Sequence, residues 1–439
     1  MNDIGSIIDQ GKITRLQISV FFICLLMNML DGMDVMVIAY AAPSLSDTWS
    51  IAPTTLGTVF SAGLLGMTLG AMLLAPIADK IGRRRMIIAC VLVMGFGTLA
   101  TAFTQTVAQL IALRILSGLG IGALLATAAT MTAEYVPARY RNLIMSSVFA
   151  GYPLGAFLSG LVAASVIPIY GWTSIFVVAG VATLATVFLV WFILPESLEF
   201  LIKTRPSNAL KEINRILARM DQPVLETLPP APSGEKIKRA SVAALFAEER
   251  RSRTTWLWIA FFTAFATLYF LATWIPKLAS GTGLSLELAI YAGTVFNLGA
   301  FIGMISQGYF SHKFGLRKTI CVFLIGTAVL MVFFGMWSKP AVILTMFGFI
   351  GFGLQGGFIG LYVVAARLYP TEIRNTGIGW GIGAGRLGAI IGPKVGGILV
   401  GMGLTLTTNF MIFALPLVLS GLATLMIGKI DDSQPPGTE

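Results

Sequence analysis

Charged residues are scarce in this chain. Only 11% of its 439 residues are charged, whereas 56% are hydrophobic and the mean hydropathy is +0.84. A soluble domain carries about 25% charged residues, because it must cover its surface with groups that water solvates. The composition therefore excludes an ordinary soluble domain and indicates a protein with many membrane-spanning segments.

Histidine and cysteine are rarer still, and both shortages exclude classes of site. The chain has one histidine, His312, and three cysteines, Cys24, Cys90 and Cys321, which all lie in apolar runs. Scattered cysteines of this kind predict neither a disulfide framework nor a metal site. The sequence shows no intramembrane set of nucleophile, base and acid, and no nucleotide-binding loop. We therefore expect no enzyme activity and no cofactor or metal.

Long apolar runs are abundant instead. Twelve of them approach the roughly 20 residues that a helix needs to cross a bilayer, so we predict an all-α membrane protein with twelve transmembrane helices. The 48 glycines suit helices that approach one another closely in lipid. The predicted spans cover residues 16–42, 55–78, 86–104, 107–132, 143–166, 172–194, 255–279, 286–311, 318–337, 340–366, 375–400 and 405–428.

The basic residues lie almost entirely on one side of these spans. Of the 30 lysines and arginines, 25 fall in the termini and in the loops that share their side, and only Lys277 and Lys339 fall in loops on the other. By the positive-inside rule, both termini are cytoplasmic. The net charge of +10 is then a sign of membrane topology, and it predicts no nucleic-acid partner.

The chain repeats itself at a constant offset. The loop segment Asp79-Lys-Ile-Gly-Arg-Arg-Arg85 is echoed by His312-Lys-Phe-Gly-Leu-Arg-Lys318, 233 residues later. Pro137-Ala-Arg-Tyr-Arg-Asn142 is echoed by Pro370-Thr-Glu-Ile-Arg-Asn375 at the same offset. A constant offset over so long a register predicts two pseudo-symmetric halves, with a substrate site expected between them.

The repeat also predicts the domain organisation. We expect a six-helix half over residues 1–194, a basic cytoplasmic linker over 195–254, and a second six-helix half over 255–439. Leu210, Ile213, Leu217 and their neighbours recur on one helical face of the linker. Such amphipathic helices are expected to lie along the cytoplasmic leaflet.

Two acids lie inside the first predicted span. Asp31 and Asp34 occur in a run without lysine or arginine, where a carboxylate costs several kcal/mol. At i and i+3 they share one helix face. An intramembrane acid of this kind is expected to belong to an ion, proton or substrate path.

The loop repeat, together with the pattern Arg114-x-x-x-Gly118-x-Gly120-x-Gly122 and the run Pro195-Glu-Ser197, resembles the major facilitator superfamily over essentially the whole chain. Ala75 departs from the glycine that usually opens the first loop motif. His312 departs from the acid of its echo, which puts a symmetric role for the two loops in doubt.

Within that superfamily, Asp31-Gly-Met-Asp34, Leu194-Pro-Glu-Ser-Leu198 and Gly385-Arg-Leu-Gly388 are similar to the aromatic acid:proton symporters. The resemblance implies an importer of aromatic carboxylates such as 4-hydroxybenzoate, protocatechuate or benzoate. Protons are the implied coupling ion.

Depth along the helices suggests which buried charges meet. At 1.5 Å per residue, Asp31 lies roughly 20 Å from the cytoplasmic edge of a core about 30 Å thick, and Arg114 lies roughly 10 Å below the outer edge. The two are thus at one level, and Arg114 is expected to hold Asp31 or Asp34. Arg386 lies roughly 15 Å deep, near the midplane. Its guanidinium is the predicted carboxylate ligand, with internal pairing to an acid as the alternative.

Other polar and aromatic residues within the spans are candidates for substrate contact. Tyr152 and Tyr269 are predicted to stack on a substrate ring, and Asn297 and Gln355 to read a ring hydroxyl. Asp34 joins them as a candidate, because its part in binding and in proton coupling is left open. Hydrogen bonds between helices are the alternative use of all these residues.

The loop charges are predicted to act as a conformational latch, whose salt bridges hold one facing state and break in the other. Direct substrate contact is not expected there. His312 is either a pH-sensitive residue of the latch or a residue with a purely structural role. The predicted latch residues are Asp79, Lys80, Gly82, Arg83, Arg85, Glu134, Arg141, His312 and Arg374.

These observations together predict a proton-coupled importer of aromatic carboxylates that works by alternating access. We expect it in the bacterial inner membrane, embedded in lipid and functional as a monomer. Proton coupling is favoured because an anion must otherwise enter against an inside-negative potential. A proton antiporter that exports drugs or metabolites is the alternative within transport, and a non-transporting ligand sensor is the alternative outside it.

Overall fold

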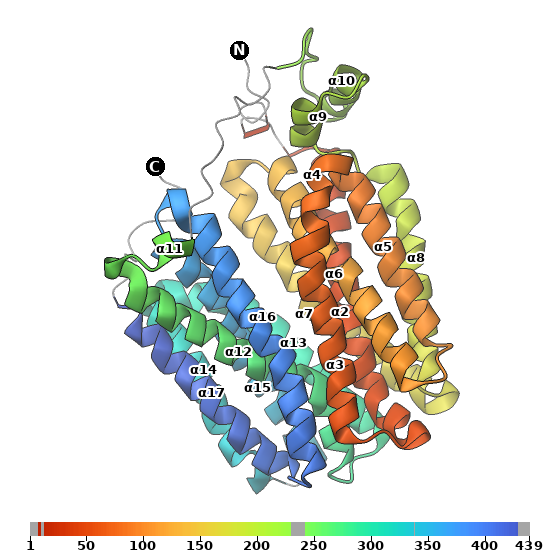
Figure 1. Cartoon of the computed structure of the whole chain (residues 1–439), viewed down its shortest axis with the longest axis vertical. Helices are drawn as coiled ribbons and strands as arrows, with labels where there is room; N and C mark the ends of the chain where they lie inside the picture. Colours follow the sequence, from red (N-terminus) through yellow and green to blue (C-terminus); the bar gives the residue numbers. More distant parts are fainter. Residues whose placement is uncertain (1–7, 10–12, 230–241, 338, 429–439) are drawn as a thin grey trace. The chain divides into compact units, whose positions relative to one another are not determined.

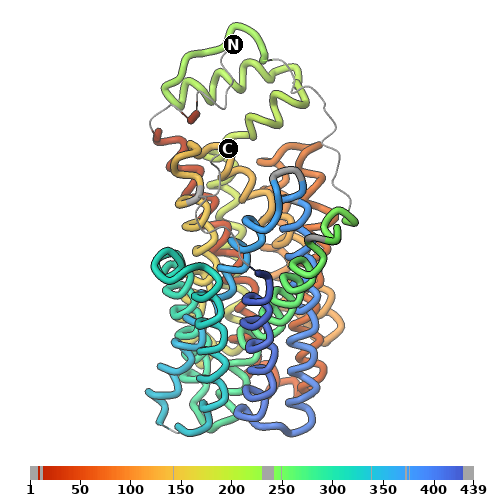
Figure 2. Tube along the Cα trace, turned by 90° about the vertical axis from the view of Figure 1, so that its left-hand side faces the viewer, coloured from red at the N-terminus to blue at the C-terminus, as the bar shows by residue number. Residues whose placement is uncertain are grey.

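All regular structure in the described part of the chain is helical. The computed structural model describes residues 8–9, 13–229, 242–337 and 339–428 (Figures 1 and 2). The main helices are α2 (Arg15–Trp49), α3 (Pro53–Leu69), α4 (Ala78–Ile81), α5 (Arg83–Thr101), α6 (Val107–Tyr135), α7 (Ala138–Tyr170), α8 (Thr173–Ile193), α9 (Leu198–Thr204), α10 (Ala209–Arg219), α11 (Val242–Leu245), α12 (Glu248–Ser280), α13 (Leu286–Phe314), α14 (Leu316–Phe333), α15 (Pro340–Leu368), α16 (Thr371–Gly401) and α17 (Leu406–Met426).

Eleven helical segments are long and apolar enough to cross a membrane among the described residues. The segment α16 is a twelfth long helix, which contains Arg386, Lys394 and many glycines. The all-α prediction with twelve spans is thereby confirmed. Several helices extend beyond the predicted apolar runs, as α2 does from 16–42 to Arg15–Trp49, because a helix continues from the hydrocarbon core into the headgroup region.

The chain forms two compact units. Unit 1 comprises Met1–Asp34, Leu65–Gly155 and Phe176–Lys236. Unit 2 comprises Val35–Leu64, Ala156–Ile175 and Ile237–Glu439, so it joins parts of α2, α3 and α7 to the helices of the second repeat. Within unit 2, for example, the Ser61 hydroxyl donates to the Ile390 carbonyl at 2.7 Å. The division into halves at 195–254 stays a prediction from the repeat.

The linker contains the short helices α9 and α10, which lie beside the end of unit 1 that carries α4 (Figures 1 and 2). Ile213, Ile216 and Leu217 of α10 are buried, whereas Lys211 is exposed. The predicted amphipathic helix therefore forms, with its apolar face covered. Its contact with lipid remains a prediction.

The internal repeat is visible in how the helices touch. In unit 1, a Cβ added to Gly66 would lie 2.3 Å from the Ile115 carbonyl oxygen. In unit 2, a Cβ added to Gly299 would lie 1.9 Å from the Gly348 carbonyl oxygen. Each residue of the second pair lies 233 positions after its counterpart in the first. The same close helix crossing is thus built twice, and only glycine permits it.

The two repeated loops share a backbone conformation as well. Gly82 has φ +102° and ψ +143°, and Gly315 has φ +88° and ψ +142°. These positive φ values favour glycine because it has no Cβ. Each glycine ends one helix and opens the next, which explains why the loop motif repeats at this position.

The close crossing at Gly299 leads to a stability prediction. Gly299→Ala is expected to destabilise the folded protein by about 2 kcal/mol or more, because the new Cβ overlaps a backbone oxygen that cannot move alone. Gly308→Ala in the same helix is the matched control, since nothing lies within 4 Å of its added Cβ. Thermal unfolding in detergent should show a lower midpoint for Gly299→Ala only. Equal midpoints for the two variants would contradict the close crossing.

Candidate functional site

A buried ion pair joins α2 to α6 in unit 1. Arg114 Nη1 donates to Asp34 Oδ2 at 3.5 Å, and the Thr98 hydroxyl donates to Asp34 Oδ1. Arg114 Nη2 also donates to the Thr101 hydroxyl at 3.1 Å. Asp34 and Arg114 are each only 2% exposed. Of the two acids predicted as partners of Arg114, the structure therefore pairs it with Asp34.

Aromatic and glycine contacts fix the surroundings of this pair. The Arg114 guanidinium lies 5.2 Å from the centre of the Phe176 ring, a cation–π distance. Asp31 is buried one turn before Asp34, at 1% exposure. Between them, a Cβ on Gly32 would lie 1.9 Å from the Tyr152 carbonyl oxygen, so α2 crosses α7 here. Arg114 thus holds Asp34 in a buried site, and Asp31 is buried one turn earlier on the same helix.

A second charged site lies in unit 2. Arg386 of α16 is half-buried, and the backbone of its neighbour Gly385 lies against the Phe265 ring of α12, which stacks on Tyr269. The two predicted residues, Arg386 and Tyr269, are therefore brought to one neighbourhood. Tyr362 completes it, and the sequence analysis missed that residue.

Five rings from two helices gather at Arg386, and we call them the aromatic cluster: Phe261, Phe265, Tyr269, Phe358 and Tyr362. The Phe265 ring stacks on Tyr269 at 6.0 Å and meets Phe358 edge-on at 4.7 Å. Tyr362 meets Phe358 at 5.5 Å and Phe261 at 5.4 Å. A spacing of four residues on each helix was the available signal, because it places rings on one face.

Glycine lets α16 approach the aromatic cluster. A Cβ on Gly385 would lie 2.3 Å from the Phe265 ring, and one on Gly381 would lie 3.3 Å from the Phe261 ring. The Arg386 side chain is therefore attached to a stretch of backbone that packs directly against these rings. A flat apolar wall beside a permanent cation suits a planar anion.

The remaining substrate candidates have different surroundings. Asn297 donates to the Tyr40 hydroxyl at 3.3 Å and to the Gly293 carbonyl at 2.8 Å. Gln355 is 6% exposed, and its Oε1 has no hydrogen-bond partner among the described residues. Tyr152 is half-buried in unit 1, whereas the other three of this set belong to unit 2.

Tyr40 also ties helices together within unit 2. Its hydroxyl donates to the Ala156 carbonyl at 2.8 Å, so α2 and α7 meet α13 through one buried tyrosine. Lys277 pairs with Asp47 at 3.1 Å at the ends of α12 and α2. These contacts join segments of the first repeat to helices of the second on the side away from the basic loops.

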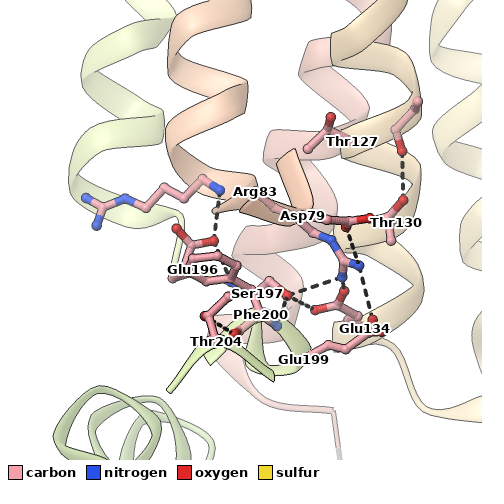
Figure 3. A network of polar contacts seen from close by, with 12 residues as sticks. Asp79, Arg83, Thr127, Thr130, Glu134, Glu196, Ser197, Glu199, Phe200 and Thr204 are labelled. Atoms are coloured by element: carbon pink, nitrogen blue, oxygen red, sulfur yellow. Dashed lines mark hydrogen bonds and ion pairs between the residues drawn. The ribbon is translucent and has the colours of Figure 1, made fainter. Parts of the chain in front are cut away.

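A polar network surrounds Arg83 in unit 1 (Figure 3). The guanidinium pairs with Glu134, with Glu199 at 3.1 Å and with Asp79 at 3.6 Å. It also donates to the Ser197 hydroxyl at 3.2 Å, and that hydroxyl donates to Glu134 at 2.6 Å. Arg83 is only 8% exposed, whereas the Asp79 and Glu199 side chains are each 57% exposed, so a buried guanidinium links α4, α5, α6 and α9 through a partly exposed network.

The run before α9 supplies half of this network. The Arg84 amide donates to Glu196 Oε1 at 3.0 Å, and the Tyr135 hydroxyl donates to the Glu196 carbonyl at 2.5 Å. Gly82 is needed here too, since a Cβ would lie 2.5 Å from Glu196 Oε2. Glu196, Ser197 and Glu199 were missed as latch residues. The signal was the run Pro195-Glu-Ser-Leu-Glu199, whose two acids need hydrogen-bond donors.

Three of the predicted latch residues of the first repeat lie outside this network. Lys80 and Arg85 are exposed and form no ion pair with a described residue. Arg141 lies 4.0 Å from Asp9, and both side chains are exposed. Exposed pairs of this kind contribute little to stability.

The echo loop of the second repeat is built differently. His312 is exposed at the end of α13, and Arg374 donates through Nε to the Tyr369 carbonyl at 3.3 Å. Arg317 donates to the Leu425 carbonyl at 3.2 Å. Burial raises the pKa of the Tyr369 phenol, and its hydrogen bond with Thr254 offsets part of that rise. Among the described side chains, those of the echo loop (residues 312–318) form no ion pair, because Leu316 stands at the position that corresponds to Arg83.

The network around Arg83 leads to a prediction. Arg83→Met is expected to lower the free energy of unfolding by about 3 kcal/mol, because it leaves Glu134, whose side chain is only 13% exposed, without its cation. Uptake rate should fall with it, since the network joins four elements. Arg85→Met is the matched control in the same loop, where the side chain is exposed. Thermal unfolding and initial uptake rates measure the two effects. An Arg83→Met protein with a nearly unchanged unfolding midpoint would exclude a structural role for Arg83.

Comparison with known proteins agrees with this architecture. The family model of the Major Facilitator Superfamily matches residues 24–309 and 277–439. The 4-hydroxybenzoate transporter PcaK of Pseudomonas aeruginosa is 32% identical, over 98% of this chain and 96% of that protein. The gallate transporter of Pseudomonas putida is 32% identical, over 97% of this chain and 95% of that protein.

Solved structures share the fold. An inward-open structure of the xylose transporter XylE from Escherichia coli matches with a TM-score of 0.73 at 16% identity, over 95% of this chain and 98% of that one. A crystal structure of a D-xylose-proton symporter matches with a TM-score of 0.75 at 16% identity, over 95% of this chain and 99% of that one. With the family match over most of its length, the chain belongs to the major facilitator superfamily of membrane transporters and, within it, to the family of aromatic acid transporters.

Proposed function

We propose that this protein is a proton-coupled importer of aromatic carboxylates that works by alternating access. The observation that carries the proposal is the half-buried Arg386 beside the aromatic cluster. A guanidinium binds a carboxylate through two parallel hydrogen bonds, and aromatic walls suit a flat ring. The names of related proteins, which include transporters of 4-hydroxybenzoate, gallate and benzoate, support the same substrate class.

Proton coupling is assigned to Asp31, Asp34 and Arg114. Arg114 holds Asp34 in a buried site. If the arginine leaves, the buried carboxylate loses its compensation and binds a proton more readily. A change in pairing then loads or releases one proton as the transporter changes its facing state. Asp34 also stays a candidate for substrate contact, with Tyr152, Tyr269, Asn297 and Gln355.

The network around Arg83 is assigned to the conformational latch on the cytoplasmic side. The Tyr40 and Lys277 contacts of unit 2 are assigned to the opposite side. We place the protein in the bacterial inner membrane as a monomer, with both termini cytoplasmic, because the basic loops share that side.

Two other functions fit the same fold. A proton antiporter would use the same acids but would not need a cation at the substrate site, so Arg386 disfavours it. A ligand sensor without net flux would bind the acid but would gain nothing from a buried latch. No feature of either site favours these alternatives.

Uptake into proteoliposomes tests the proposal. The panel consists of 4-hydroxybenzoate, protocatechuate, benzoate, a linear dicarboxylate and a cationic dye, with and without an inward proton gradient. Accumulation of an aromatic acid only under the gradient is the expected result. Gradient-driven movement of the dye alone would point to the antiporter, and binding without accumulation would point to the sensor.

A further inference from the structure

One face of α15 carries three residues that the proposed transport function has not fully used. Gln355, Phe358 and Tyr362 follow at i, i+3 and i+7, so they line a single face of the helix. The first and the last lie seven positions apart, which is about 10 Å along the axis. The two ends of this face have different chemistry.

The Tyr362 end is the anion end. Its ring packs against Phe261 and Phe358 of the aromatic cluster, and the backbone of Gly385, next to Arg386, lies against Phe265 of the same cluster. Tyr362 and Arg386 are both half-buried, so each retains some accessible surface. A phenolic hydroxyl can donate to a carboxylate oxygen that the guanidinium also holds.

The Gln355 end carries an unused polar group. Gln355 is only 6% exposed. Its amide oxygen is buried and has no hydrogen-bond partner among the described residues. Buried polar groups are nearly always hydrogen-bonded, so an exception calls for an explanation. A ligand hydroxyl that enters during transport would supply the missing bond.

Phe358 lies between these two ends and gives the face an apolar middle. Its ring meets Phe265 at 4.7 Å and Tyr362 at 5.5 Å, both edge-on. A substrate ring placed along the face would therefore meet aromatic carbon on two helices, α12 and α15. A benzene ring with substituents at opposite positions, together with one hydrogen bond at each end, spans about the length of this face.

We propose that the Gln355–Phe358–Tyr362 face of α15 selects benzoates that carry a hydroxyl opposite the carboxylate. Tyr362, with Arg386, binds the carboxylate, and Gln355 binds the ring hydroxyl. The inference rests on the proposed transport of aromatic carboxylates and adds which member of that class the site prefers. Tyr362 becomes a further binding residue, and Gln355 becomes the residue that determines specificity.

Binding of benzoate and 4-hydroxybenzoate to purified full-length protein tests the two ends separately. Gln355→Leu is expected to weaken binding of 4-hydroxybenzoate about tenfold, by the loss of one hydrogen bond, and to leave benzoate within about twofold. Tyr362→Phe keeps the ring and removes the hydroxyl. It is expected to weaken both acids by a similar factor, about tenfold.

Two controls separate binding from folding. Tyr309→Phe makes the same chemical change at a ring that is 67% exposed on α13, and it should bind both acids like the unaltered protein. Thermal unfolding should show Gln355→Leu at least as stable as the unaltered protein, because the substitution removes an unsatisfied buried group.

The outcomes distinguish this inference from the proposed function. If the unaltered protein binds neither acid, the proposed function fails and the inference fails with it. If the unaltered protein binds 4-hydroxybenzoate but Gln355→Leu affects both acids alike or neither, Gln355 does not read the hydroxyl. A Tyr362→Phe protein weakened only toward the hydroxylated acid would show the opposite ligand orientation and overturn the assignment.

Discussion

Arg386→Lys is expected to weaken binding of an aromatic carboxylate by about 3 kcal/mol, roughly 100-fold, while the protein stays folded. Lysine keeps the positive charge but loses the planar fork that holds both carboxylate oxygens. Its ammonium is also more strongly hydrated, which disfavours a site walled by the aromatic cluster. Equilibrium binding of benzoate and 4-hydroxybenzoate to purified protein measures the loss.

The same substitution at Arg317 is the matched control. Arg317 lies in unit 2 as well, on α14, where it donates to the Leu425 carbonyl at 3.2 Å. Arg317→Lys should leave affinity within about twofold, because exposed interactions of this kind contribute little. Unchanged affinity in Arg386→Lys would remove Arg386 from the binding site, whatever the control shows.

Asp34→Asn is expected to abolish accumulation driven by a proton gradient, while exchange of substrate across the membrane without a gradient continues. Asparagine can still accept hydrogen bonds from Thr98 and Arg114, but it cannot take up or release a proton. Asp31→Asn should have the smaller effect on the ion pair, because Arg114 pairs with Asp34. Uptake with and without an imposed gradient, compared with counterflow, separates coupling from transport.

Loss of the charge at Asp34 also leaves Arg114 buried without its partner, which is destabilising by about 3 kcal/mol. The double variant Asp34→Asn/Arg114→Gln removes both charges and should recover much of that stability. It should not recover coupling. Gradient-driven accumulation that persists in both Asp34→Asn and Asp31→Asn would defeat the assignment of protons to this pair.

The two charged sites reflect an asymmetry between the repeats. The positions 233 residues after Asp31 and Asp34 hold Ala264 and Thr267, and the position 233 residues before Arg386 holds Pro153. The backbone crossings were duplicated, whereas each ionisable group occurs once. This arrangement suits the proposed transporter, in which the coupling acids and the carboxylate-binding arginine have different roles.

The membrane class, the helices and the repeat could be predicted because each depends on properties that run along the chain. Apolar runs of the required length indicate that each helix is surrounded by lipid, and a constant offset between similar motifs indicates that one half of the chain repeats the other. The glycines at 82 and 315 share a positive φ, so the loop motif itself carried its backbone conformation. Depth arithmetic placed Arg114 and the acids at one level for the same reason, since helical rise is constant.

The tertiary structure decided which side chains meet. Depth in the membrane allowed Arg114 to pair with either of two acids. The way α2 packs against α6 pairs it with Asp34. The aromatic cluster was not predicted because helices apolar on every side show no preferred face, so sequence does not reveal which rings turn toward Arg386. Glu199 of α9 reaches the Arg83 guanidinium, and Glu196 reaches the Arg84 amide, only when a distant segment folds back. Sequence by itself thus determined the helices, their depth and their duplication. Packing between helices determined the sites, because the side chains that meet depend on how each helix is rotated about its axis, and hydropathy does not encode that rotation.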